Sequence, residues 1–148
     1  MYALRYEDRA TDRDWADVLT KFPLFAGVGK RQLRKLVRTA DFAELARGEH
    51  LVSNGAGSDS LYVVLGGAAK VLHPAPRSIA TGDYFGELGV LGGQSRSFHV
   101  IATQELHLMK LPCKPVFELA RRHPPVTLTL LKGLGRRLQE VSVQARAS

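Results

Sequence analysis

The residues best suited to chemistry in this sequence lie between positions 85 and 97, FGELGVLGGQSRS. Gly86 lets the backbone approach a ligand closely, because it carries no side chain. A helical turn over residues 87–91 would direct N–H groups without internal partners at an anion. The planar guanidinium of Arg96 fits paired phosphate oxygens. Glu87 would repel a phosphate, so its presence makes sense if the ligand also offers hydroxyl donors and Arg96 balances both negative charges. This combination predicts a site for a sugar phosphate or a nucleotide.

A simpler explanation of the same residues stays open at this point. A glycine-rich bend with one glutamate and one arginine is, taken alone, more often a surface loop with an ion pair. The residue types by themselves favour that loop, so the choice depends on the wider pattern of the chain.

Other kinds of site find little support in the composition. The single cysteine, Cys113, excludes a disulfide within the chain and a four-cysteine metal site. The five histidines show no metal-ligand spacing, so we expect no metal. No P-loop, nucleophile elbow or pair of carboxylates in a cleft context is present, and we predict that the protein is not an enzyme.

Length and charge set the broad class of the protein. The 148 residues, 45% of them hydrophobic and 24% charged, predict one globular domain. The net charge of +7 makes an anionic partner worth considering. The first residues lack the apolar run of a secretory signal, and the longest nearly apolar stretch, residues 61–69, is far too short to span a bilayer. We therefore expect a cytoplasmic protein that does not enter a membrane.

The hydrophobic periodicity changes twice along the chain. Helical spacing and well-placed prolines predict helices over residues 14–21, 30–38 and 116–122, and a last helix that opens at Pro124. Between them, short apolar or alternating stretches separated by turns predict antiparallel strands. These strands are expected over residues 41–45, 50–53, 60–65, 68–73, 78–80, 97–103 and 105–111.

The fold class predicted from this order is α+β: an antiparallel, jelly-roll-like β-roll flanked by N-terminal and C-terminal helices. We expect a flexible N-terminal arm over residues 1–12 and one domain over residues 13–148. Within that domain, residues 13–38 would form the N-terminal helices, residues 39–112 the roll, and residues 113–144 the C-terminal helices.

Several segments resemble the cyclic nucleotide-binding domain family, in the order in which that family has them. Phe85-Gly86-Glu87-Leu88 and Arg96-Ser97 resemble its phosphate-binding cassette, which includes a short helix. Residues 22–25, 48–49, 60–64 and 81–84 resemble other segments of the family. The resemblance covers about residues 15–142, and the family includes catabolite activator protein and the regulatory subunits of cyclic-AMP-dependent protein kinase. It favours a binding site over a surface loop.

The resemblance implies cyclic AMP or cyclic GMP as the ligand. Glu87 would accept a hydrogen bond from the ribose 2′-OH, and Arg96 would pair with the cyclic phosphate. Backbone N–H groups of residues 86–88, which follow Phe85, would complete the phosphate cradle together with Ser97.

The resemblance also implies where the base would lie. Val63, Val71 and Leu88 are the expected apolar wall for the base. Val141 and Ser142 in the last helix would form a lid over it. Val141 stands where catabolite activator protein has a threonine, which removes one hydrogen bond to the base, and Phe98 is bulkier than the family's usual residue.

The predicted function is a stand-alone cyclic nucleotide sensor whose last helix changes position on binding and so signals to an unknown protein effector. Only six residues follow Ser142, so we expect no DNA-binding domain, and nucleic acid is the least favoured partner. The last helix also carries an apolar stripe of Leu131, Leu134, Leu138 and Val141. Such a stripe more often packs against its own roll than forms a coiled coil, and the resemblance implies the alternative of a homodimer joined along this helix. The alternative function is a degenerate fold that acts as a ligand-free interaction or scaffold domain.

A basic cluster over residues 30–38 is a separate feature. Its five cations, Lys30, Arg31, Arg34, Lys35 and Arg38, lie largely on one side of the predicted helix. A solvated face is the favoured explanation, and docking to an acidic partner or to nucleic acid is the alternative.

Overall fold

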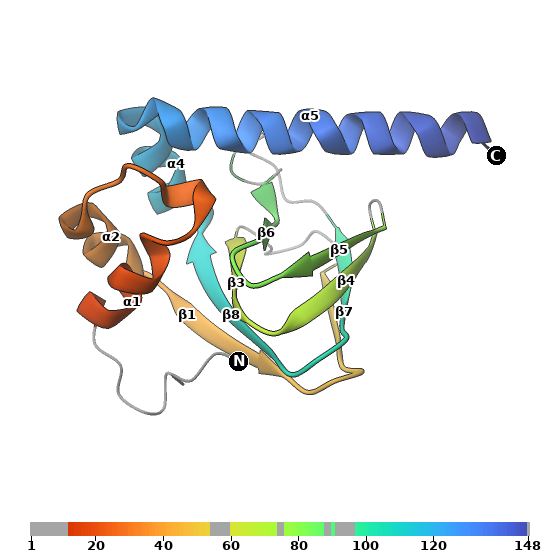
Figure 1. Cartoon of the computed structure of the whole chain (residues 1–148), viewed down its shortest axis with the longest axis horizontal. Coiled ribbons are helices and arrows are strands. Elements are labelled where there is room, and N and C mark those ends of the chain that lie inside the picture. Colours follow the sequence, from red (N-terminus) through yellow and green to blue (C-terminus); the bar gives the residue numbers. More distant parts are fainter. Residues whose placement is uncertain (1–11, 54–59, 74–75, 88–89, 91–96, 148) are drawn as a thin grey trace.

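The computed structural model describes residues 12–53, 60–73, 76–87, 90 and 97–147 of the chain (Figure 1). Two helices precede the strands, α1 (Asp12–Leu19) and α2 (Lys30–Val37), with a short 3-10 helix at Pro23–Phe25 between them. Two helices follow the strands, α4 (Cys113–Arg122) and α5 (Pro124–Ala147). The strands are β1 (Asp41–Leu45), β2 (His50–Ser53), β3 (Ser60–Gly66), β4 (Ala68–His73), β5 (Arg77–Ala80), β6 (Tyr84–Phe85), β7 (Phe98–Ala102) and β8 (Leu106–Pro112).

The strands form two four-stranded sheets, ordered β1-β8-β3-β6 and β2-β7-β4-β5. All the neighbouring strands pair antiparallel. The predicted α+β class, a β-roll flanked by helices at both ends of the sequence, is confirmed. The short strand β6 was not predicted, and α4 begins three residues before the helix expected from Val116.

Strand β3 separates the two parts of the hydrophobic core. Each of its residues is buried, which explains the continuous apolar run in the sequence. Leu61, Val63 and Leu65 pack against the helices, whereas Tyr62 and Val64 pack inside the roll. Because side chains alternate between the two faces of a strand, one strand can supply both clusters.

Two clusters of buried side chains result from this alternation. The helix-facing cluster joins α1, α2, α4 and α5 to the sheet that contains β3. In the roll interior, the ring of Tyr62 stacks on Phe85 at 4.9 Å between centroids, and Phe98 meets both rings edge-on. Among the largest buried members of the helix-facing cluster are Trp15, Leu19, Phe25, Leu33, Met109 and Leu130.

Helix α5 lies along one side of the molecule, over α4 and β6, and continues beyond them toward the C-terminus (Figure 1). Its first turns are anchored in the helix-facing cluster, because Val126 and Leu130 are fully buried there. Farther along, Leu138 is exposed. None of the described helices combines the length and the apolar character required to cross a lipid bilayer.

Two glycines with positive φ permit a direct test of how tightly the roll is packed. Gly67 has φ +93° between β3 and β4, and a Cβ there would overlap the backbone carbonyl of Glu105. We expect Gly67→Ala to lower the free energy of unfolding by about 3 kcal/mol, since the left-handed strain and the overlap add. Urea denaturation measures the change.

The matched control is Gly48→Ala, because Gly48 has φ +88° but no neighbour within 4 Å of its added Cβ. It should cost only about 1 kcal/mol, the strain of the backbone alone. Equal losses in the two variants would contradict the close packing described at Gly67.

Candidate functional site

The site begins where β6 ends. Tyr84 and Phe85 of β6 pair with Val63 and Tyr62 of β3, which fixes the position of the residues that follow. Gly86 then takes φ +91°, and a Cβ there would lie 2.6 Å from the carbonyl oxygen of Ser60. Only glycine fits this position without displacing the backbone. Gly86 therefore lets the chain turn sharply from the sheet into the segment that carries Glu87.

Glu87 is buried, with 3% of its surface exposed, and its backbone is helical. Its Oε1 forms an ion pair with the guanidinium Nη1 of Arg137 in α5. The Arg137 side chain is itself only 14% exposed. Among the described residues, the second carboxylate oxygen, Oε2, has no hydrogen-bond partner. A buried carboxylate oxygen without a partner is costly, so a donor that reaches this atom would be favourable.

Tyr84 brings α5 close to the site. Its hydroxyl donates a hydrogen bond to the carbonyl oxygen of Thr129 at 3.3 Å. The guanidinium carbon of Arg137 lies 5.7 Å from the centre of the Tyr84 ring, within the range of a cation–π contact. A Cβ on Gly133 would lie 2.7 Å from the Tyr84 hydroxyl, so a glycine in the middle of α5 permits this approach.

Arg77 supports the same tyrosine from the opposite end. Its Nη2 donates to the backbone carbonyl oxygen of Tyr84 at 2.9 Å. Burial lowers the pKa of Arg77, and burial together with the positive charge of Arg77 lowers the pKa of Arg137 to about 10. Arg137 therefore remains protonated at neutral pH.

The predicted phosphate and ribose residues are only partly described. Phe85 is buried in the roll interior, and Gly86 and Glu87 are placed as above. Leu88 and Arg96 lie outside the described residues. Ser97 is exposed, with its Oγ 3.2 Å from Nε2 of His73.

The residues predicted to surround the base lie in different parts of the fold. Val71 is buried in the roll interior. Val63 instead belongs to the helix-facing cluster, so the structure does not bring it together with Val71. Val141 and Ser142 belong to α5, but their side chains lie outside the described residues.

Sequence reasoning missed Arg137 and the role of Gly133. Both lie on the side of α5 that carries Leu130, at positions three and seven residues later. That helical spacing places them on the buried face and was the available signal. In the part of the chain that is described, no group of three or more histidine, cysteine, aspartate or glutamate side chains could hold a metal ion.

The comparisons with known proteins identify the family. The cyclic nucleotide-binding domain matches residues 42–123, more than half of the chain. The chain therefore belongs to the cyclic nucleotide-binding domain family, as the sequence resemblance predicted.

Solved structures share the fold. Catabolite activator protein from Thermus thermophilus is 25% identical, with a TM-score of 0.63, over 84% of this chain and 62% of that one. The regulatory subunit of a cAMP-independent protein kinase A from Trypanosoma brucei has a TM-score of 0.70 over 93% of this chain and 52% of that one. At 19% identity, the second likeness shows the fold alone.

Among curated relatives, an uncharacterised NTE family protein of Mycobacterium tuberculosis is 26% identical over 139 residues. The match takes in 92% of this chain but 24% of that protein. The chain thus spans about a quarter of the length of the relatives of this kind that it matches.

Removing Arg137 tests whether its charge stabilises the site. We expect Arg137→Met to lower the free energy of unfolding by about 3 kcal/mol in urea denaturation, because it leaves Glu87 buried without its counter-charge. Adding Glu87→Gln to this variant should restore at least about 1 kcal/mol, since the two effects are coupled.

The matched control is Arg136→Met, because Arg136 is the neighbouring arginine on α5 and is exposed. It should change the free energy of unfolding by no more than about 0.5 kcal/mol. If the two methionine variants unfolded alike, Arg137 would not be a significant stabilising contact.

Proposed function

We propose that this chain is a regulatory domain that binds cyclic AMP or cyclic GMP and passes the signal on through α5. The observation that carries the proposal is Oε2 of Glu87, a buried carboxylate oxygen with no hydrogen-bond partner among the described residues. Glu87 directly follows Gly86, which has no side chain and so would let the backbone come close to a phosphate. Membership of the cyclic nucleotide-binding domain family supports the same ligand class.

Glu87 can serve the ligand and the helix together, because it has two oxygens. Oε1 faces Arg137, which leaves Oε2 to accept a hydrogen bond from a ribose 2′-OH. Arg96 would then pair with the cyclic phosphate, aided by backbone N–H groups of residues 86–88 and by Ser97. The base would lie against Val71 and Leu88.

Binding at Glu87 would reach α5 through Arg137. A hydrogen bond to one oxygen redistributes charge on the carboxylate and changes its attraction to the arginine. Helix α5 contacts Glu87 through Arg137 and approaches Tyr84 at Gly133 and Thr129. A change at Glu87 would therefore alter how α5 packs on the roll. The domain would act by binding rather than by catalysis, with a protein effector in the cytoplasm that senses the position of α5.

Calorimetric titration with cyclic AMP and cyclic GMP tests the proposal. We expect Arg96→Ala to weaken binding of the preferred nucleotide by about tenfold to a hundredfold, because a charge-assisted hydrogen bond worth about 1.5–3 kcal/mol is lost. Glu87→Gln should also weaken it, since an amide is a poorer acceptor for the 2′-OH than a carboxylate.

Arg47→Ala is the control, because Arg47 is an exposed arginine in the turn before β2. It should bind like the wild type. Unchanged affinity in the Arg96 variant would refute the assignment of the phosphate site.

A ligand-free scaffold is the second candidate function, and Phe98 favours it. Its ring is buried against Tyr62 and Phe85 in the roll interior, where it adds bulk close to the cassette. A wild-type melting temperature that stays constant with millimolar cyclic AMP, cyclic GMP and cyclic dinucleotides would favour the scaffold over the sensor.

Homodimer formation along α5 is a further part of the proposal. Leu131 and Leu138, seven residues apart, are 49% and 65% exposed, which leaves an apolar seam uncovered in one copy. We expect a dimer in analytical ultracentrifugation and at least about tenfold weaker association for Leu138→Glu, since a charge would be buried in the seam. Gln139→Glu, on the adjacent exposed residue, should leave the dimer intact. A wild type that stays monomeric at about 100 μM would contradict this part of the proposal.

A further inference from the structure

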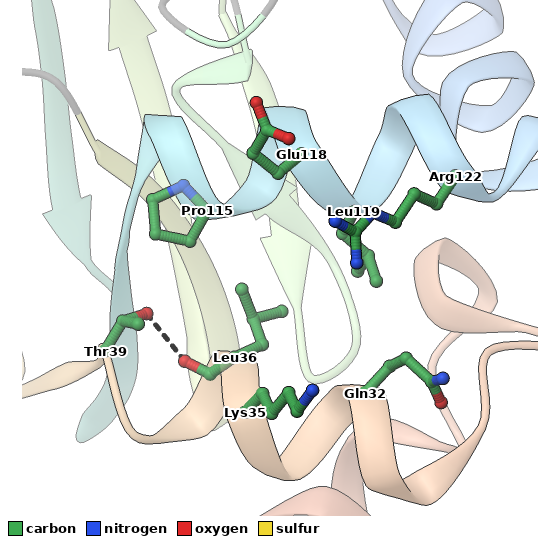
Figure 2. Close-up of a pocket in the computed structure, with 8 residues that line it drawn as sticks. All are labelled: Gln32, Lys35, Leu36, Thr39, Pro115, Glu118, Leu119 and Arg122. Carbon is green, nitrogen blue, oxygen red and sulfur yellow. Dashed lines mark hydrogen bonds between the residues drawn. The ribbon is translucent and has the colours of Figure 1, made fainter.

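A groove between α2 and α4 shares no residue with the candidate site. It has a volume of about 320 Å³. Figure 2 shows the side chains of Leu36 from α2 and Leu119 from α4 pointing into the space between the two helices. Both leucines are buried, and Pro115 lies beside them at the start of α4. The floor of the groove is therefore apolar.

The helices on either side of the groove are strongly basic. Helix α2 carries four cations and no acidic residue, and α4 carries three cations and one acidic residue. Some of these charges are already paired, Lys30 with Asp17 at 3.2 Å and Arg121 with Glu118 at 3.3 Å. Lys35 and Arg122 line the groove, are exposed, and form no ion pair within the described part of the chain.

From this arrangement we propose that the groove docks an acidic segment of a partner protein. An apolar side chain of that segment would pack on Leu36 and Leu119, and carboxylates before and after it would pair with Lys35 and Arg122. Rim charges of this kind steer and orient a partner, while the apolar floor supplies desolvated contact. This surface goes beyond nucleotide binding, because it describes how the domain contacts another protein.

The chemistry of the groove favours a protein segment over nucleic acid. A phosphate backbone offers no apolar group for Leu36 and Leu119, whereas a leucine or phenylalanine side chain does. Glu118 also lines the groove, where its carboxylate is paired with Arg121 at 3.3 Å. Of the five cations in the basic cluster, Lys35 is the one that lines the groove.

The test uses the full chain, labelled with ¹⁵N, and a panel of 12-residue peptides in which one or two leucines are flanked by aspartate and glutamate. We expect amide shifts in NMR titrations to concentrate on Gln32, Lys35, Leu36 and Leu119. Changing the peptide leucines to serine should weaken binding by about fivefold, since the apolar contact is lost. No shift at these residues with about 1 mM of any peptide would overturn the proposal.

Charge reversal separates the groove from the general positive charge. Lys35→Glu with Arg122→Glu should weaken peptide binding by about tenfold or more. The matched control, Lys70→Glu with Lys132→Glu, makes the same change on exposed residues of β4 and α5 and should stay within about twofold. Equal losses of peptide affinity in the two double variants would mean that the peptide is attracted by the overall positive charge of the domain, and would overturn the proposal.

Two further outcomes would also overturn it. One is a serine peptide that binds the wild type as well as the leucine peptide does, a comparison that needs no variant of the protein. The other is a 20-base-pair DNA duplex that binds the wild type more tightly than every peptide but does not bind the Lys35→Glu, Arg122→Glu variant. That result would assign the surface to nucleic acid. Neither result depends on whether the domain binds cyclic nucleotides.

Discussion

The buried ion pair between Glu87 and Arg137 is the contact on which the site depends. A carboxylate that is 3% exposed needs a counter-charge, and here it comes from a helix fifty residues later in the chain. The same carboxylate keeps a second oxygen without a partner among the described residues. One side chain therefore contacts α5 and also belongs to the ligand site that we propose, which is why we propose that the two are coupled.

The surrounding residues serve to bring these two charges together. Gly86 lets the chain turn at a point where a Cβ would collide with Ser60, and Gly133 lets α5 approach Tyr84. A glycine in the interior of a helix lowers helix stability by about 1 kcal/mol relative to alanine, but Gly133 is needed here because a Cβ would collide with the Tyr84 hydroxyl. Tyr84 is held in turn by Arg77 and by Thr129, on opposite ends of the residue. Tertiary contacts therefore outweigh helix propensity where α5 packs against the roll.

Much of the fold follows from local patterns, whereas the complete site does not. Helical spacing predicted the helices on both sides of the roll, and the short strands separated by turns predicted the roll itself. The resemblance to the cassette singled out Glu87, whose role toward a ligand stays a prediction. The resemblance placed Val63 beside the base as an apolar residue of the roll. The run in β3 is apolar throughout, and such a run does not reveal which residues face the roll and which face the helices. Arg137 was not predicted to pair with Glu87, because a contact across fifty residues depends on how α5 crosses the roll and leaves only a helical spacing in the sequence.

The most direct measurement is the distance between α5 and the roll, obtained by pulsed electron resonance on spin labels at Lys70→Cys and Lys132→Cys in a Cys113→Ser background. Both labelled positions are exposed, on β4 and α5. If Glu87 holds the helix, the distance distribution is narrow, changes when cyclic nucleotide is added, and becomes broad when Glu87→Gln removes the charge. A distribution that is the same with glutamate or glutamine at position 87, with and without nucleotide, would contradict the account.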